Sequence, residues 1–367
     1  ELERVWQHRA GELYDASAVE RAQGEAYALY AERGYLYLNI EPREITRDSV
    51  IDVAFGVTEG RPSIVRLVNI VGNRGTREKV MRRQITIHEG DRFRRSALVR
   101  TQGDVFRLGI FSDVQMDFAP AESSDVDINV KVTEKQVGTA SAGAGFTSEN
   151  GLTGFLELGH NNVLGNAQTL TLHLERGGRT SNYLVSFIEP WFHDTPTLLG
   201  FSAFNSTTDR DFFKQKRVGG SGQIGRPLRH PDFSHLSLSY RLEGVTYDQL
   251  AATQASSIQD SITLEDIDPG KSRLSSNVAV TFTRNNTENP FYPTRGTRLT
   301  LVDEFTGGPF GGTVDFHKHR IDGRLYVPSV VKGLTTMLRA RVGLLGEYAN
   351  ERLHHVPAYE RFRLGGG

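Results

Sequence analysis

The chain contains no cysteine and no large excess of either charge. Without cysteine there can be no disulfide framework, thiolate zinc site or cysteine nucleophile, and the absence suits a protein that passes through an oxidising compartment. The 43 basic and 44 acidic side chains nearly cancel, so the sequence lacks the positive charge that nucleic-acid binders use to contact phosphates. A role on nucleic acid is therefore not expected.

Long hydrophobic runs are also absent. No segment approaches the roughly 20 apolar residues of a membrane-spanning helix, and the first five residues, ELERV, lack the charged-then-apolar order of a signal peptide. If the protein is secreted, we expect its natural N-terminus to precede Glu1. With 38% hydrophobic residues, the chain can still bury two or three ordinary cores or one large sheet.

The pattern changes near Gln136. Before this point helix and strand alternate: Val19, Ala22, Ala26 and Leu29 mark a helix within Asp15–Arg33 that ends at Gly34. Two strands follow, Tyr35–Ile45 and Val50–Val57. The same order then returns with an opening strand: strand Ile64–Val71, helices Arg77–Gln84 and Ser96–Leu108, strands Phe111–Phe118 and Val126–Val132. Two copies of a module of about 70 residues, the first without its opening strand, indicate a tandem array.

After Val137 the sequence consists of segments of about ten residues that alternate apolar and polar positions, which is typical of a membrane β-barrel. Leu236, Leu238, Tyr240 and Leu242 share one face, and Ser237, Ser239, Arg241 and Glu243 the other. Leu338, Ala340, Val342 and Leu344 are similarly opposed by Arg339 and Arg341. About eleven such segments start near Val137, Leu152, Gln168, Asn182, Thr197, Phe212, Ser234, Arg273, Gly296, Thr313 and Leu334.

The connections support a barrel, because outer-membrane barrels have short periplasmic turns and longer external loops. If Val137 enters from the periplasm, the periplasmic turns are Asn161–Gly165, Pro190–Pro196, Arg226–Asp232, Asn285–Arg295 and Pro328–Gly333. The external set includes the long stretch Tyr247–Lys271. Eleven strands cannot close without leaving an edge that lipid would not tolerate, so we expect this chain to be a fragment.

Several motifs now carry a family resemblance. Segments Val65–Asn73, Val80–Arg83, His88–Asp91 and Leu108–Phe111 resemble the last POTRA module of the BamA-type assembly factors. The barrel segments Asn161–Gly165, Glu189–Phe192, Gly225–Leu228 and Asn289–Gly296 are similar to the family's periplasmic turns. The tail Tyr359–Gly367 resembles the segment that leads into the family's VRGF loop motif.

The resemblance implies a fold and a set of domains. The fold is α+β POTRA modules of order β-α-α-β-β followed by an all-β antiparallel transmembrane barrel, with about eleven of its sixteen strands present. The expected domains are a partial POTRA at residues 1–60, the last POTRA at 61–135, and the N-terminal part of the barrel at 136–367.

The resemblance also implies a function. It points to a non-enzymatic factor that folds client β-barrel proteins into the outer membrane, with its POTRA modules in the periplasm and no cofactor, nucleotide or metal. Its partners would be unfolded outer-membrane clients, BamD-like periplasmic lipoproteins of the assembly complex, and lipid. TamA-like modules and two-partner secretion pores share this plan and remain alternatives; the pore would be marked by a plug helix before the POTRA modules.

The first barrel strand is the candidate site for pairing with client strands. An inserted sheet with a weakly closed seam offers a template edge, and small residues make side-chain packing across that seam poor. A purely structural alternative is that small residues only let a tilted strand pass the POTRA linker. The candidate residues are Gly138, Ala140, Ala142, Gly143, Ala144, Gly145 and Phe146.

The last POTRA module offers a second candidate surface. The resemblance suggests that Glu89, in a turn between two helices, docks a BamD-like lipoprotein, with Arg82 and Arg83 nearby. An ordinary solvated face with weak ion pairs explains these residues equally well. The strand Phe111–Phe118 could also accept an extended client segment along its edge.

Signals for an enzyme are weak. Gly220–Gly225 satisfies G-x-G-x-x-G, but the turn Arg226-Pro227-Leu228 follows where the dinucleotide fingerprint needs a helix. His317 and His319 share one strand face without a third metal ligand, so we expect a lumen-facing polar pair. His354 and His355 would point opposite ways in an extended segment. No nucleophile elbow or paired-carboxylate motif is present.

Overall fold

The computed structural model describes residues 11–147, 151–209, 214–248, 270–288, 292–331 and 333–348, together with 356, 360 and 362. By its internal contacts the chain divides into two compact units. The first contains residues 1–137 and 164–167, and the second contains residues 138–163 and 168–367.

The first unit begins with a helix and a hairpin. Helix α2 (Ala16–Glu32) starts at Asp15, whose side chain accepts a hydrogen bond from the Ser17 backbone N–H at 2.9 Å. The predicted helix is confirmed, and Gly34 follows it with φ +92°, the left-handed conformation that glycine tolerates best. Strands β1 (Asn39–Arg47) and β2 (Val50–Thr58) then pair antiparallel. The first strand starts four residues later than the sequence predicted.

The second module of this unit has the predicted order of elements. They are β3 (Val65–Val71), α3 (Glu78–Arg82), α4 (Arg95–Arg107), β4 (Phe111–Pro120), a short 3₁₀ turn η1 (Glu122–Ser124) and β5 (Val126–Glu134). The sheet order is β3-β5-β4, with β3 parallel and β4 antiparallel to the central β5. Helix α4 packs on β4. Strands β3 and β4 are thus the two sheet edges.

One hydrophobic core holds this module together. Its fully buried members come from both helices, all three strands and the loops between them, and burying each large apolar side chain stabilises the fold by about 1.5–3 kcal/mol. They include Val65, Val80, Met81, Ile87, Val105, Ile110, Ile128 and Val130. The backbone also packs closely at the turn after β3. Gly72 has φ +97°, and a Cβ added there would lie 2.0 Å from the carbonyl oxygen of Val132. The turn after β3 therefore requires glycine.

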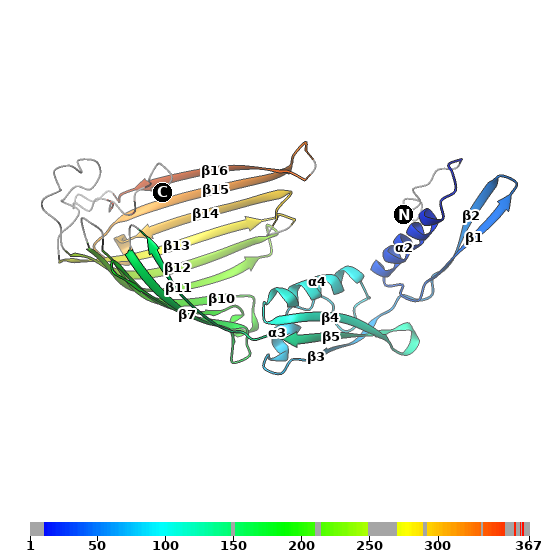
Figure 1. The fold of residues 1–367 in the computed structure, drawn as a ribbon, viewed down its shortest axis with the longest axis horizontal. Helices are drawn as coiled ribbons and strands as arrows, with labels where there is room; N and C mark the ends of the chain where they lie inside the picture. Colours follow the sequence, from blue (N-terminus) through cyan, green and yellow to red (C-terminus); the bar gives the residue numbers. More distant parts are fainter. Residues whose placement is uncertain are drawn as a thin grey trace. The chain divides into compact units, whose positions relative to one another are not determined.

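The second unit is an eleven-stranded antiparallel sheet in which each strand pairs with the next along the chain (Figure 1). The strands are β6 (Gly138–Thr147), β7 (Gly151–Val163), β8 (Gln168–Gly177), β9 (Thr180–Glu189), β10 (Leu198–Asp209), β11 (Lys214–Leu228), β12 (Ser234–Asp248), β13 (Ser272–Asn285), β14 (Gly296–Thr306), β15 (Phe316–Pro328) and β16 (Thr335–Gly346). Short 3₁₀ turns η2 (Phe192–Asp194) and η4 (Gly308–Phe310) lie in two connections. The prediction of eleven strands is confirmed, although the predicted start at Phe212 lies outside the described residues.

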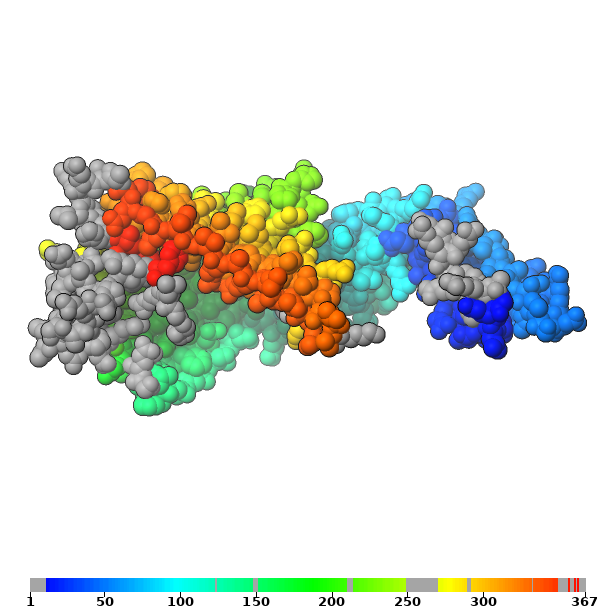
Figure 2. All heavy atoms as spheres, turned by 90° about the horizontal axis from the view of Figure 1, so that it is seen from above, coloured from blue at the N-terminus to red at the C-terminus, as the bar shows by residue number. Residues whose placement is uncertain are grey.

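The strands are long and the sheet is curved. Several reach 13 to 15 residues, beyond the usual five or six of soluble strands. None of the described helices is long and apolar enough to cross a membrane. In Figure 2 the atoms of β15 and β16, coloured orange to red, form one continuous surface without a gap between the strands.

The two faces of the sheet differ in the way the alternation predicted. A polar cavity of about 450 Å³ lies on one face and is lined by Gln223, Ser239, Arg241, Asn277, Glu304 and Lys318 among others. We call this the lumenal face. Apolar side chains on the opposite face are exposed, including Leu236, Leu238, Tyr240 and Leu242. An exposed apolar band is the arrangement of a wall that meets lipid.

The prediction for His317 and His319 was wrong about their face. Lys318 and Arg320 line the lumenal cavity, and side chains alternate along a strand, so the two histidines lie on the outer face. Ile321 and Leu325 have the same parity and are exposed there. His317 Nδ1 and His319 Nε2 are 3.0 Å apart, and His319 Nδ1 lies 2.7 Å from Asp303 Oδ1.

Candidate functional site

The first candidate site is the open edge of β6. Among the described residues, β6 pairs only with β7, in a register that sets Gly138 opposite His160 and Thr147 opposite Gly151. All ten of its residues are exposed. In the described part of the chain β6 and β16 are the two outer strands of the sheet, and β6 is the one whose small residues make it the candidate for pairing with a client strand.

The seven predicted seam residues all lie on this strand but not on one face. The register places Gly138, Ala140, Ala142, Ala144 and Phe146 outward; Ala140 lies opposite Leu158 and Ala142 opposite Leu156. Gly143 and Gly145 lie on the lumenal face. The outward row is almost bare of side-chain bulk, and only Phe146, 76% exposed, projects far from it.

Gly143 is covered by an aromatic ring. A Cβ added to Gly143 would lie 2.6 Å from Cε1 of Phe155, whereas one added to Gly145 would meet nothing within 4 Å. The Phe155 ring in turn stacks on His173, with centroids 6.3 Å apart and planes 16° apart. His173 Nδ1 is 3.1 Å from Glu157 Oε2. The Phe155 ring therefore covers the lumenal side of β6 at Gly143, a contact that side-chain composition did not predict.

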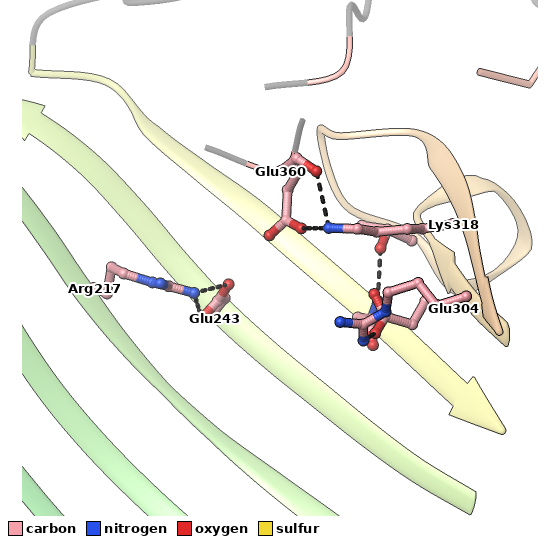
Figure 3. A network of polar contacts seen from close by, with 8 residues as sticks. Arg217, Glu243, Glu304, Lys318 and Glu360 are labelled. Carbon is pink, nitrogen blue, oxygen red and sulfur yellow. Dashed lines mark hydrogen bonds and ion pairs between the residues drawn. The ribbon is translucent and has the colours of Figure 1, made fainter. Parts of the chain in front are cut away.

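The second candidate feature is a line of ion pairs on the lumenal face (Figure 3). Nη2 of Arg217 on β11 donates to both oxygens of Glu243 on β12, at 2.8 and 2.9 Å. The Glu243 side chain is only 5% exposed. A carboxylate this buried needs such a partner, because an unpaired buried charge is costly.

A second group of ion pairs lies on β14 to β16. Nζ of Lys318 donates to the Glu360 carbonyl oxygen at 2.8 Å and to its carboxylate at 3.2 Å. The Phe362 ring lies with its centroid 5.2 Å from the same Nζ. Arg320 pairs with Glu304. Two residues of the predicted loop tail therefore rest on the lumenal wall; the other residues of 359–367 lie outside the described part.

Two of the predicted POTRA docking residues, Arg82 and Glu89, form hydrogen bonds to the backbone of β3. Nη2 of Arg82 donates to the carbonyl oxygen of Val68 at 3.4 Å, and a Glu89 oxygen accepts from the Val68 N–H at 3.4 Å. Nη2 of Arg83 donates to the Asn166 carbonyl oxygen at 3.2 Å. Arg82 and Glu89 are exposed and Arg83 is half-buried. Two of the three thus cover the free edge of β3, which a neighbouring strand would otherwise use.

The weak enzyme signals of the sequence gain no support from the described residues. The described part of the chain holds no group of three or more histidines, aspartates or glutamates suited to a metal ion. The motif Gly220–Gly225 lies within strand β11 and no helix follows it. His354 and His355 lie outside the described residues.

Comparison with known proteins decides the family. The sequence model of the Omp85 superfamily domain matches residues 162–367, more than half of the chain. The chain belongs to the Omp85 superfamily. A second model, a POTRA repeat described as a surface antigen variable number repeat, matches residues 63–135. This membership confirms the predicted family and agrees with the expectation that the chain is not an enzyme.

Two of the similar curated proteins are BamA assembly factors. The chain is 28% identical over 346 residues to an outer membrane protein assembly factor BamA from Nitratidesulfovibrio vulgaris, covering 92% of this chain and 41% of the relative. It is 26% identical over 378 residues to the BamA of Neisseria meningitidis, covering 100% of this chain and 47% of the relative. The chain therefore spans about half the length of these relatives.

A solved structure shows the same fold. The crystal structure of BamA from Haemophilus ducreyi lacking POTRA domains 1–3 matches 100% of this chain and 71% of its own, with a TM-score of 0.75 and 20% identity. The predicted fold, POTRA-like α/β structure followed by part of an antiparallel barrel, is thereby confirmed.

Proposed function

We propose that the protein is an outer-membrane protein assembly factor of the BamA type. In this proposal it sits in the outer membrane with its POTRA modules in the periplasm, and it folds client β-barrels into the membrane. The supporting observation is the joint presence of a POTRA module and an Omp85 barrel sheet in one chain. The domain limits 1–60, 61–135 and 136–367 form part of the proposal.

The open edge of β6 is the proposed pairing site for client strands. A client strand that enters lipid must not leave its backbone groups unpaired, because each unpaired group costs several kcal/mol in hydrocarbon. Pairing with β6 would satisfy those groups one strand at a time. The small outward row from Gly138 to Ala144 offers little side-chain contact that a client would need to displace.

The POTRA residues are proposed to dock a periplasmic lipoprotein partner. Arg82 and Glu89 already bond the backbone of Val68 on the β3 edge. A partner that docks there would exchange these long hydrogen bonds for its own, so the edge can be opened at low cost. Arg83 would contribute less, since its guanidinium is held by the Asn166 carbonyl oxygen.

Disulfide cross-linking in the full-length protein tests the pairing proposal. Single cysteines would replace Ala140, Ala142 and Ala144 in turn and be combined with cysteines along the C-terminal strand of a stalled client. This chain has no cysteine of its own, and disulfides need Cα atoms about 4.4–6.8 Å apart. We expect adducts in which each two-residue step on β6 shifts the client partner by two residues.

Ser239 is the matched control position, because β12 has a strand on both sides and Ser239 lies on the lumenal face. It should give no register-specific adduct. Adducts found only at lumenal positions such as Arg241 or Arg339, with none along β6, would contradict strand templating and favour a secretion pore through the lumen.

A further inference from the structure

Two histidines lie side by side on the outer face of β15. His317 and His319 are two residues apart on one strand, so their side chains point to the same side. Nδ1 of His317 is 3.0 Å from Nε2 of His319, and the two ring centroids are 5.1 Å apart. β15 is an inner strand of the sheet, paired with β14 on one side and with β16 on the other. The strands that surround the pair are therefore all described.

A carboxylate fixes the proton positions of the pair. Asp303 lies directly opposite His319 on β14, and its Oδ1 is 2.7 Å from His319 Nδ1. An ionised carboxylate only accepts hydrogen bonds, so His319 Nδ1 carries the proton and donates it to Asp303. Nε2 of the neutral ring then presents its lone pair to His317, whose Nδ1–H donates to it. The contact leaves His319 with an unprotonated nitrogen that faces a second imidazole.

The spacing of the facing nitrogens suits a metal ion. Histidine nitrogens bind metals at about 2.0–2.1 Å, so two nitrogens at a right angle on one ion lie about 3.0 Å apart and two at a tetrahedral angle about 3.4 Å apart. The observed 3.0 Å matches the right angle, which is the geometry of square-planar Cu²⁺ sites. Asp303 holds the other ring nitrogen, as carboxylates commonly do for metal-binding histidines. Its negative charge also attracts a cation and repels an anion such as phosphate.

The neighbouring residues leave the pair room and access to water. Gly346 of β16 lies opposite His317, and a Cβ added there would lie 2.6 Å from Cε1 and Nε2 of the ring. The ring of Phe305 is 5.8 Å from that of His319, and the ring of Tyr348 is 5.6 Å from that of His317. Aromatic girdles mark the interfaces of a barrel wall, and the pair lies within the first four residues of β15. Dissolved ions can therefore reach the two rings.

We propose that the histidine pair binds Cu²⁺ through Nδ1 of His317 and Nε2 of His319, with Asp303 orienting His319. The ion takes the place of the proton between the two nitrogens; that proton moves to Nε2 of His317 or to water, and no electron is transferred. The rings turn about their soft Cβ–Cγ torsions so that both lone pairs point to the ion, and water fills its remaining positions. The site does not depend on the assembly function proposed above, because it uses no client strand and no POTRA residue.

Copper titration of the full-length protein tests the site. The protein, without a histidine tag and in lipid nanodiscs, would be stripped of metal and titrated with Cu²⁺ in competition with a chromophoric chelator. His317→Gln and His319→Gln each remove one ligand, and Asp303→Asn removes the orienting carboxylate. His160→Gln is the matched control, because His160 also faces outward, on β7, but has no second histidine two residues away. The difference in gel mobility between the folded and the unfolded barrel verifies that each variant is folded.

We expect the wild-type protein to bind one Cu²⁺ that the His317→Gln and His319→Gln variants do not bind. Asp303→Asn should bind this ion about 10–100-fold more weakly, and His160→Gln should titrate like the wild type. Copper held by other histidines of the full-length protein contributes equally to every sample. The electron paramagnetic resonance spectrum of the bound Cu²⁺ should show coupling to two imidazole nitrogens, which is lost in His317→Gln.

Equal copper binding by the wild type and both histidine variants would overturn the proposal and leave a hydrogen-bonded pair without a metal. An equal loss in His160→Gln would also contradict it, because outward histidines would then bind copper without a paired ring. If a variant does not fold, the spectrum of the wild type decides alone, and a signal without two-nitrogen coupling refutes the site. Client folding is measured separately, and its loss or survival does not alter the outcome.

Discussion

The buried pair Arg217–Glu243 should stabilise the barrel sheet measurably. Breaking a buried ion pair costs about 3–5 kcal/mol when the remaining charge is left uncompensated. The Arg217 side chain keeps 32% of its surface exposed, so water can screen part of that loss. We therefore expect Glu243→Ala to lower the free energy of unfolding by about 2–3 kcal/mol, and hydrogen bonds to charged groups alone account for about 1.5–3 kcal/mol.

A double-mutant cycle isolates the contact. Glu243→Gln, Arg217→Met and their combination would be compared in the full-length protein in detergent by urea titration. Unfolding would be followed by the difference in gel mobility between the folded and the unfolded barrel. The coupling energy should be about 1.5–2.5 kcal/mol, which lies within the range for residues in direct contact. The double variant should lose less unfolding free energy than the sum of the losses of the two single variants.

The pair Arg320–Glu304 is the internal control, because it lies on the same lumenal face but is more exposed, at 44% and 17% of its side-chain surfaces. Its coupling should be about 0.2–1 kcal/mol, as for exposed pairs. Equal coupling in both pairs would refute the reasoning from burial, and coupling below about 0.5 kcal/mol for Arg217–Glu243 would remove this pair as a source of stability.

Three further predictions rest on single contacts. Gly143→Val should displace the Phe155 ring and lower the urea midpoint of the barrel, whereas Gly145→Val has open space and should leave it within error; equal midpoints would contradict the aromatic contact. Gly72→Ala should destabilise the POTRA module by about 2 kcal/mol or more in thermal unfolding, because its positive φ and the close carbonyl strain any Cβ, and an unchanged melting temperature would argue against that approach. Burial raises the pKa of Glu134, but its hydrogen bonds from the turn after β3 lower it more, so its net pKa lies below the usual range; the POTRA module should thus lose stability as pH falls below about 4.3, and Glu134→Gln should flatten that pH dependence in denaturant titrations.

The sequence predicted the elements well because their signals are local. The helix from Ala16 to Glu32 has an apolar stripe of its own, a capping aspartate directly before it and Gly34 two residues after it. The barrel strands repeat one alternation many times, so their number and starts could be counted. The boundary of β1 was less accurate, since Tyr35 and Leu36 pack against the hydrophobic cores without joining the hairpin.

The face of His317 and His319 shows a limit of alternation. Period two fixes which residues share a face but does not say which face meets water. The signal was present in the same strand, because Ile321 and Leu325 have the parity of the two histidines while Lys318 and Arg320 have the other. The polarity of the two histidines favours the lumenal face, but the exposed apolar residues of the same parity place them on the outer face.

The contacts that matter most for the candidate sites depend on register, which no local signal contains. Gly143 lies opposite Phe155 and Asp303 opposite His319 only because each turn has the length observed. A shift of one residue would move every side chain of a strand to the other face. It would place the arginines of β15 and β16 among apolar groups, at a cost in a lipid-facing wall of about 2–4 kcal/mol for each arginine near the bilayer midplane. The lumenal position of these arginines therefore helps to fix the register of β14 to β16.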